Sequence, residues 1–168
     1  MALSNVFLQI VFDGKALPGE ATADGFVGQI VVESMSWQAT ATHKPVADDK
    51  VSTEWRPQSL RLGKVFDKAS TALYQKMRDR EKFDSATVTV VDLTLFGEKP
   101  EAVMVMQVKN GFLEQINTKA ADAGSFMRIG EDLTLSFNEG KLSYFPYTET
   151  GRGTATEFPM PRMDSSKS

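Results

Sequence analysis

The chain has 168 residues, of which 41% are hydrophobic and 24% are charged, a composition typical of one soluble globular domain. Its 19 Lys and Arg residues against 22 Asp and Glu residues give a net charge of −3, which argues against nucleic acid as a partner because phosphate-binding surfaces usually carry a basic excess. The absence of cysteine excludes disulfides, zinc–thiolate sites and a thiol nucleophile.

The first alternating apolar segment, 6–12, lies close to the N-terminus, and no basic segment precedes it. We therefore predict no signal peptide and synthesis in the cytoplasm. No apolar stretch approaches the roughly 20 residues that a membrane helix needs, so membrane insertion is not expected. Any export would use a route that does not require a cleaved signal peptide.

Apolar residues that alternate with period two predict strands along the first third of the chain. The first strand is expected at 6–12, the second at 26–40 and the third at 60–66. Residues 41–58 interrupt this pattern with many charges and two prolines. We predict a long polar loop there, and loops of this length are usually functional or mobile.

One segment changes to helical spacing. Its apolar positions are Phe66, Ala69, Leu73 and Met77. This spacing predicts a single amphipathic helix at about 68–81. Asp67 or Ser70 is expected to cap its start, because a short oxygen side chain satisfies an unpaired N–H there.

Strand patterns return after the helix. The expected strands are 86–96, 102–109, 112–118, 133–137 and 141–147. We predict a turn at Gly97 to Pro100, a bulge or tight turn at Asn110-Gly111, and a loop of small residues at 120–130.

The elements together predict a mainly β fold, an antiparallel barrel or sandwich of about seven or eight strands with the helix at one edge. This fold is expected to occupy residues 1–147 as a single domain. From Thr148 onward Gly, Pro and Ser accumulate and little can be buried. Residues 148–168 are therefore predicted to form a flexible tail.

Candidate chemical groups are few. His43 is the one histidine, and without a Cys or carboxylate cluster beside it we interpret it as a surface residue. A hydrolase using His43 would need a nucleophile, and no G-x-S-x-G segment supplies a serine. Neither Asp48-Asp49 nor Glu131-Asp132 has calcium-loop spacing, and no Gly-rich turn cradles a phosphate. The sequence therefore predicts no enzyme, no metal and no cofactor.

The two tryptophans lie in different settings. Trp37 is on a predicted strand and is expected in the core, since aromatic residues dominate buried surface. Trp55 lies in the charged loop, where it either anchors an interface or folds back over the edge of the barrel.

Several segments, in chain order, match a known pattern. They are Val6–Ile10 with Asp13-Gly14 and Gly19–Thr22; Gln29–Trp37, which ends in Ser34-Met35-Ser36-Trp37; Asp67-Lys68-Ala69-Ser70 followed by Leu73; and Leu133–Phe137 with Tyr144–Tyr147. Over about residues 5–147 this ordered set resembles the haemolysin-coregulated protein (Hcp) family of type VI secretion systems. Ser143, Glu139-Gly140 and Phe112–Gln115 depart from the family's usual residues.

The resemblance implies a ring-forming β-barrel. Members of the family assemble as homohexameric rings, which stack into a hollow tube inside a contractile sheath and are expelled with a spike protein at the tip. The tube is thus both a machine part and a secreted product, and effectors ride in its lumen. The loop after the second strand reaches the adjoining ring. The residues implied for stacking contacts here are Lys44, Asp48, Asp49, Lys50, Glu54, Trp55 and Arg56.

Three other interpretations stay open at this point. In the first, the 41–58 loop is exposed to solvent and makes no stacking contact. In the second, the chain is a monomeric barrel that binds a small apolar ligand in a pocket lined by Val31, Val90 and Val105. In the third, it is the tube subunit of a related phage-like contractile particle.

Overall fold

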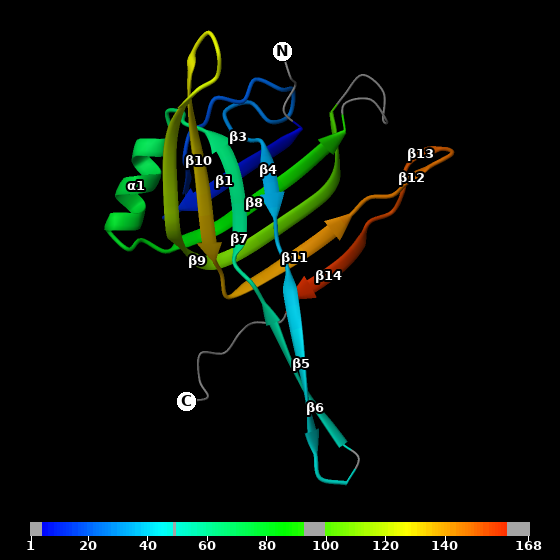
Figure 1. The fold of residues 1–168 in the computed structure, drawn as a ribbon. Coiled ribbons are helices and arrows are strands. Elements are labelled where there is room, and N and C mark those ends of the chain that lie inside the picture. The colour runs from blue at the N-terminus through cyan, green and yellow to red at the C-terminus, as the bar shows by residue number, and fades with distance from the viewer. Residues whose placement is uncertain (1–4, 49, 93–99, 161–168) are drawn as a thin grey trace.

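The computed structural model describes residues 5–48, 50–92 and 100–160. This part of the chain is mainly antiparallel β-structure with one helix, so the predicted fold class is confirmed (Figure 1). The strands are β1 (Val6–Phe12), β2 (Lys15–Ala16), β3 (Ile30–Val32), β4 (Ser34–Ser36), β5 (Ala39–Val46), β6 (Lys50–Pro57), β7 (Leu60–Val65), β8 (Phe83–Asp92), β9 (Glu101–Asp122), β10 (Met127–Ser136), β11 (Glu139–Tyr144), β12 (Tyr147–Thr148), β13 (Gly151–Arg152) and β14 (Thr156–Met160), and the helix is α1 (Ser70–Arg78).

The largest sheet follows the order β2-β1-β8-β9-β10-β7-β4, with β3 on β1, β11 on β9 and β14 on β11. β3 and β4 are separated along the chain by Glu33 alone, yet β3 pairs with β1 and β4 pairs with β7. This one segment therefore connects β1, near one end of the strand order, with β7, near the other end.

The predicted second strand at 26–40 is wrong in outline. Gly28 has a φ of 81°, and the N–H of Gln29 donates to the carbonyl of Phe26 at 3.0 Å, so a turn precedes β3. A left-handed glycine is what such a turn requires. The alternating pattern continued through this turn and through Glu33, where the chain changes partner strands.

The longest strand, β9, crosses from one part of the sheet to another at Asn110-Gly111. Asn110 has a φ of 55°, and a Cβ on Gly111 would lie 1.9 Å from the carbonyl oxygen of Ser136. The pairs Ser85↔Lys109 and Phe83↔Gly111 are nevertheless in step, so the predicted bulge or tight turn at Asn110-Gly111 is wrong. The register shifts of β9 lie opposite Val90/Val91 and Thr134/Leu135 instead. The loop predicted at 120–130 is also wrong, because β9 and β10 continue their ladder to the pair Met127↔Asp122. Of the turn predicted at 97–100, residues 97–99 lie outside the described ones.

Helix α1 covers the core at the place predicted but is shorter than 68–81. Asp67 Oδ1 accepts a hydrogen bond from the N–H of Ala69 at 3.0 Å, just before the first helical residue. At the other end Arg80 has a φ of 53°, which turns the chain out of the helix. Leu73 is completely buried against the sheet. No helix in the described ranges is long and apolar enough to cross a membrane.

The flexible tail predicted from Thr148 is wrong for residues 148–160. This stretch contains β12, β13 and β14, and β14 pairs with β11 from Gly140↔Met160 to Tyr144↔Thr156. Met160 is 5% exposed and belongs to the main core, so the segment does bury apolar surface. Residues 161–168 lie outside the described part of the chain.

Candidate assembly surfaces

The segment predicted as a polar loop is a β-hairpin that projects from the body (Figure 1). β5 and β6 pair from Ala39↔Pro57 to Val46↔Lys50 and form a separate two-stranded sheet. Threonine and valine favour extended backbone on both strands, and Asp48 supplies a left-handed residue at the turn, with a φ of 69°. The loop prediction failed because a pair of strands exposed on both faces has no apolar alternation to mark it.

The residues implied for stacking lie on this hairpin. Lys44 is on β5, Asp48 is in the turn, and Lys50, Glu54, Trp55 and Arg56 are on β6, whereas Asp49 lies outside the described residues. Arg56 and Glu54 form an ion pair at 2.7 Å, with more than half of each side chain exposed. Such a pair contributes little to folding stability and stays available to a partner.

His43 also lies on the hairpin. Its Nδ1 is 2.9 Å from the hydroxyl oxygen of Thr53 on the opposite strand, and both side chains are exposed. A hydroxyl on an exposed ribbon does not orient or charge an imidazole as a carboxylate does. This arrangement offers no base for a hydrolytic mechanism.

Both tryptophans lie at the base of the hairpin. Trp37 Nε1 donates to the carbonyl oxygen of Gln58 at 2.9 Å. The ring of Trp55 meets that of Phe158 edge to face, with centroids 5.8 Å apart. Both indoles are half-buried and pack against the core, so Trp37 is less buried than expected.

An exposed apolar tip lies at the opposite end of the molecule, where β9 and β10 extend beyond the body as a ribbon (Figure 1). Phe126, Met127 and Ile129 are 62%, 63% and 41% exposed there. Sequence reasoning missed this surface because residues 120–130 were interpreted as a loop. The signal that could have found it is the cluster of three large apolar residues among small and polar ones.

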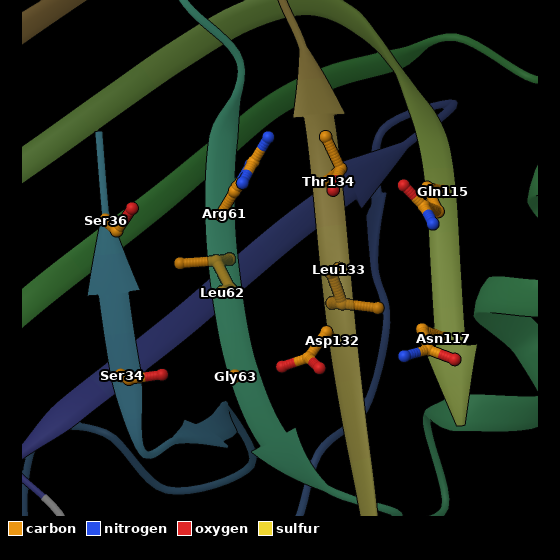
Figure 2. Close-up of a pocket in the computed structure, with 10 residues that line it drawn as sticks. All are labelled: Ser34, Ser36, Arg61, Leu62, Gly63, Gln115, Asn117, Asp132, Leu133 and Thr134. Carbon is orange, nitrogen blue, oxygen red and sulfur yellow. The ribbon is translucent and has the colours of Figure 1, made fainter. Parts of the chain in front are cut away.

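A polar face lies on the outside of β4, β7, β10 and β9. Its side chains surround a shallow depression of about 390 Å³ (Figure 2). The polar residues that line this depression are Ser34, Ser36, Arg61, Gln115, Asn117, Asp132 and Thr134. Gly63 leaves the centre of this face without a side chain, and a Cβ there would lie 2.4 Å from Ser34 Oγ. Ser34 and Ser36 of the family-like motif therefore lie on an accessible surface.

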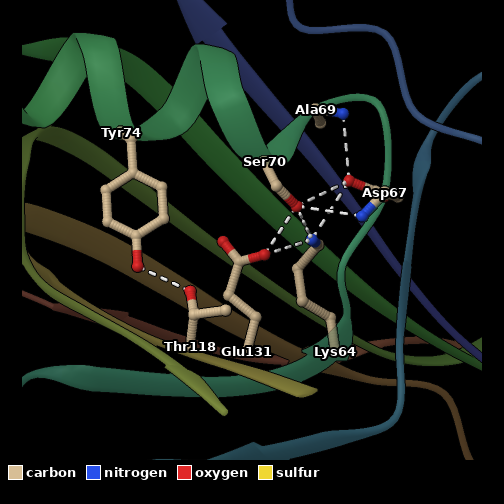
Figure 3. Close-up of polar contacts among 7 residues, drawn as sticks. All are labelled: Lys64, Asp67, Ala69, Ser70, Tyr74, Thr118 and Glu131. Carbon is tan, nitrogen blue, oxygen red and sulfur yellow. Dashed lines mark hydrogen bonds and ion pairs between the residues drawn. The ribbon is translucent and has the colours of Figure 1, made fainter. Parts of the chain in front are cut away.

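The other half of the motif builds a buried polar cluster under the start of α1 (Figure 3). Lys64 Nζ lies 2.9 Å from Ser70 Oγ, 3.0 Å from Asp67 Oδ1 and 3.1 Å from Glu131 Oε2. The Ser70 hydroxyl donates to Glu131 Oε2 at 2.5 Å, and the Lys64 and Glu131 side chains are fully buried. The cluster ties the helix start to β7 and β10, while Lys68 remains exposed.

The structure does not bring together two groups of residues that the sequence offered as candidate sites. Glu131 points under the helix whereas its neighbour Asp132 lies on the exposed polar face, so they do not form an acid pair. Val31, Val90 and Val105 are half-buried and lie outside the main core cluster, whereas Val88 and Met106 belong to it. The three valines therefore do not line an enclosed ligand pocket, and the interpretation that used them is wrong on this point.

Comparisons with known proteins agree with this geometry. The family described as "Type VI secretion system effector, Hcp" matches residues 7–144. No curated protein sequence matches the chain.

The solved structures similar to the chain include Hcp1 from Escherichia coli EAEC 042, with a TM-score of 0.73 and 14% identity over 94% of this chain and 99% of that one. Hcp1 from Salmonella typhimurium gives 0.66 and 18% over 93% and 95%. The anti-feeding prophage baseplate gives 0.51 and 11% over 84% and 94%. At these identities the structures demonstrate a shared fold.

Proposed function

This chain belongs to the Hcp family of the type VI secretion system, and from that premise we propose that it is a structural subunit of the secretion tube. It would assemble as a homohexameric ring, and rings would stack into a hollow tube. The observation that carries the proposal is the family match over residues 7–144, which spans β1 to β11. The described residues bring together no catalytic constellation that would argue for an enzyme instead.

The two projecting ends of the subunit support head-to-tail stacking. One end carries the hairpin β5–β6 and the other carries the apolar tip of β9 and β10 (Figure 1). A head-to-tail contact that repeats without closing generates a filament, whereas one that closes by rotation generates a ring. We propose that Lys44, Asp48, Asp49, Lys50, Glu54 and Arg56 supply the axial contacts, and that Trp55, at the base of the hairpin, positions them. Because several of these residues are charged, stacking should weaken as salt is added.

The partners follow from the same role. A tube subunit would contact itself, the contractile sheath and the spike protein, and it would be made in the cytoplasm and exported by the type VI system. Effectors would be carried in the ring lumen. Nucleic acid and membrane insertion have no part in this proposal.

A second candidate is the tube subunit of a phage-like contractile particle. The similarity to the anti-feeding prophage baseplate favours it, since that protein shares the fold over most of its length. The two roles differ in the larger assembly. Purification of the tube from the producing cells would recover it either as free rings in the medium or within a complete particle with its own baseplate.

The test of the ring is the solution mass of the purified chain, measured by light scattering after size exclusion. A hexamer would have about six times the 18.5 kDa chain mass. A monomeric mass at all concentrations tested would contradict the proposal.

A further inference from the structure

The hairpin has little of its own to hold its direction. β5 and β6 contain eight residues each, and all are exposed except Trp55 and Pro57. An isolated two-stranded hairpin is at best marginally stable in water. A hairpin that must reach a fixed place on a neighbour therefore needs a support close to its base.

Trp55 provides the contact for such a support. Its ring meets the ring of Phe158 at an interplanar angle of 81° and a centroid distance of 5.8 Å. This edge-to-face geometry is favourable for aromatic pairs. Phe158 pairs with Leu142 across the sheet, and Leu142 in turn pairs with the buried Met106, so Trp55 contacts the margin of the core-facing side of the sheet.

The strand that carries Phe158 is itself well fixed. β14 pairs with β11 at five positions, and its last residue, Met160, is buried in the core. Met160 Sδ lies 3.0 Å from where a Cβ of Gly140 would be, a close approach that only glycine permits without a shift. Lys141 and Glu157 add an ion pair between the two strands at 2.8 Å. β14 also lies beyond residues 7–144, which the family match covers.

We propose that β14 is a positioning strut for the hairpin, with Phe158 and Trp55 as its positioning residues. The contact between their rings sets the angle at which β5–β6 leaves the body. Trp37 packs against the core and donates a hydrogen bond to the carbonyl of Gln58, so it holds the base of the hairpin where the chain enters and leaves it. The contact of Trp55 with Phe158 lies further along β6 and ties that strand to β14. Without this contact the hairpin would keep its strand register and its base but would lose its fixed direction.

The consequence for assembly rests on the proposed tube function. A hairpin of variable direction reaches the next ring less often in the productive pose, so rings lacking the strut would stack poorly while remaining rings. The conformational part of the inference does not depend on assembly and is tested separately.

The absence of cysteine makes a direct distance measurement practical. Spin labels on Ser52→Cys in the hairpin and Gln75→Cys on α1, both exposed positions, report the hairpin direction by pulsed electron paramagnetic resonance. Labelled chains are mixed with an excess of unlabelled chains, so that distances within one chain dominate. The parent should give one narrow distance peak, and Phe158→Ala should lose that peak to a broad distribution.

Matched variants keep the test decisive. Trp55→Ala removes the contact from the hairpin side without altering β14 and should broaden the distribution equally. Phe158→Tyr retains a ring and should keep the narrow peak, as should Thr156→Ala, an exposed substitution on the same strand. Circular dichroism confirms that each variant is folded.

A narrow peak that survives in folded Phe158→Ala and Trp55→Ala would overturn the strut. If the peak broadens and the variant rings still stack to parental length in electron microscopy, the extension to assembly is wrong. A chain that proves monomeric would refute the tube function, and the distance measurement on it would still decide whether the strut exists.

Discussion

Trp37 and Gln58 are joined by a hydrogen bond of 2.9 Å between the indole N–H and the main-chain carbonyl, across the two chain segments that enter and leave the hairpin. Trp37→Phe keeps the ring and removes the donor, leaving a half-buried carbonyl without its partner. We expect a loss of about 0.5–1.5 kcal/mol in unfolding free energy. Hydrogen exchange at the base of the hairpin should accelerate, and unchanged exchange would contradict this role for Trp37.

The buried cation of the polar cluster should be important for folding. Lys64→Met leaves Glu131 and Asp67 as buried carboxylates without their cation, and we expect a loss of about 3–5 kcal/mol. Urea unfolding at fixed protein concentration measures it. Lys68→Met, at an exposed position four residues along, is the control and should change little. Equal stability of the two variants would contradict the assigned role of the cluster.

The contact between α1 and the sheet depends on Leu73. Leu73→Ala should cost about 2–5 kcal/mol, because the side chain is completely buried and the cavity would close only in part. Gln75→Ala, exposed on the same helix, should stay within about 0.5 kcal/mol of the parent. Thermal unfolding of both variants under one condition makes the comparison, and similar midpoints would be inconsistent with the packing described.

Shortening the hairpin should separate ring formation from stacking. Replacement of residues 42–54 by Asn-Gly keeps Ala41 and Trp55, which are paired across the hairpin, and it retains the contact of Trp55 with Phe158. The shortened chain should keep the ring mass in light scattering and form no stacks in electron microscopy. Stacks of parental length would remove the hairpin from the axial joint, and a loss of rings would make it a lateral contact.

Two truncations distinguish the structured and unassigned parts of the C-terminus. A chain ending at Met160, the last described residue, is the reference for this comparison. A chain ending at Ala155 loses β14 and its buried methionine, and we expect a loss of at least about 2 kcal/mol, the lower end for removing a buried Met side chain. Thermal unfolding compares the two, and equal midpoints would contradict the role assigned to β14.

The elements that the sequence predicted well are those with a clear apolar period. β7 alternates buried and less buried residues, β1 buries Leu8, Ile10 and Phe12 on one face, and α1 buries Leu73 on one side, so period alone was enough to place them. The hairpin has no buried face, and its strands are held by main-chain pairing, which leaves no mark in hydrophobicity. β14 was not predicted, because a short strand that contains Pro159 and is preceded by Gly151 and Gly153 has the composition of a tail.

The sequence pattern identified residues of the candidate site more readily than the contacts between them. The motif Asp67 to Ser70 was recognised, but its partners Lys64 and Glu131 are brought in by separate strands, and Glu131 is 61 residues from Ser70 in the chain. Similarly, Trp55 could be placed in the polar segment 41–58, but its partner Phe158 lies in the segment predicted as a tail. Pairings over such distances depend on strand order, and period and composition do not report strand order.

The central claim is that the chain builds a ring, and the most direct measurement is electron microscopy of the purified protein with classification of single particles. The account predicts annular particles with sixfold symmetry and a central lumen, some of them stacked end to end at low salt. Compact particles the size of one chain, with no annulus at any concentration, would contradict it.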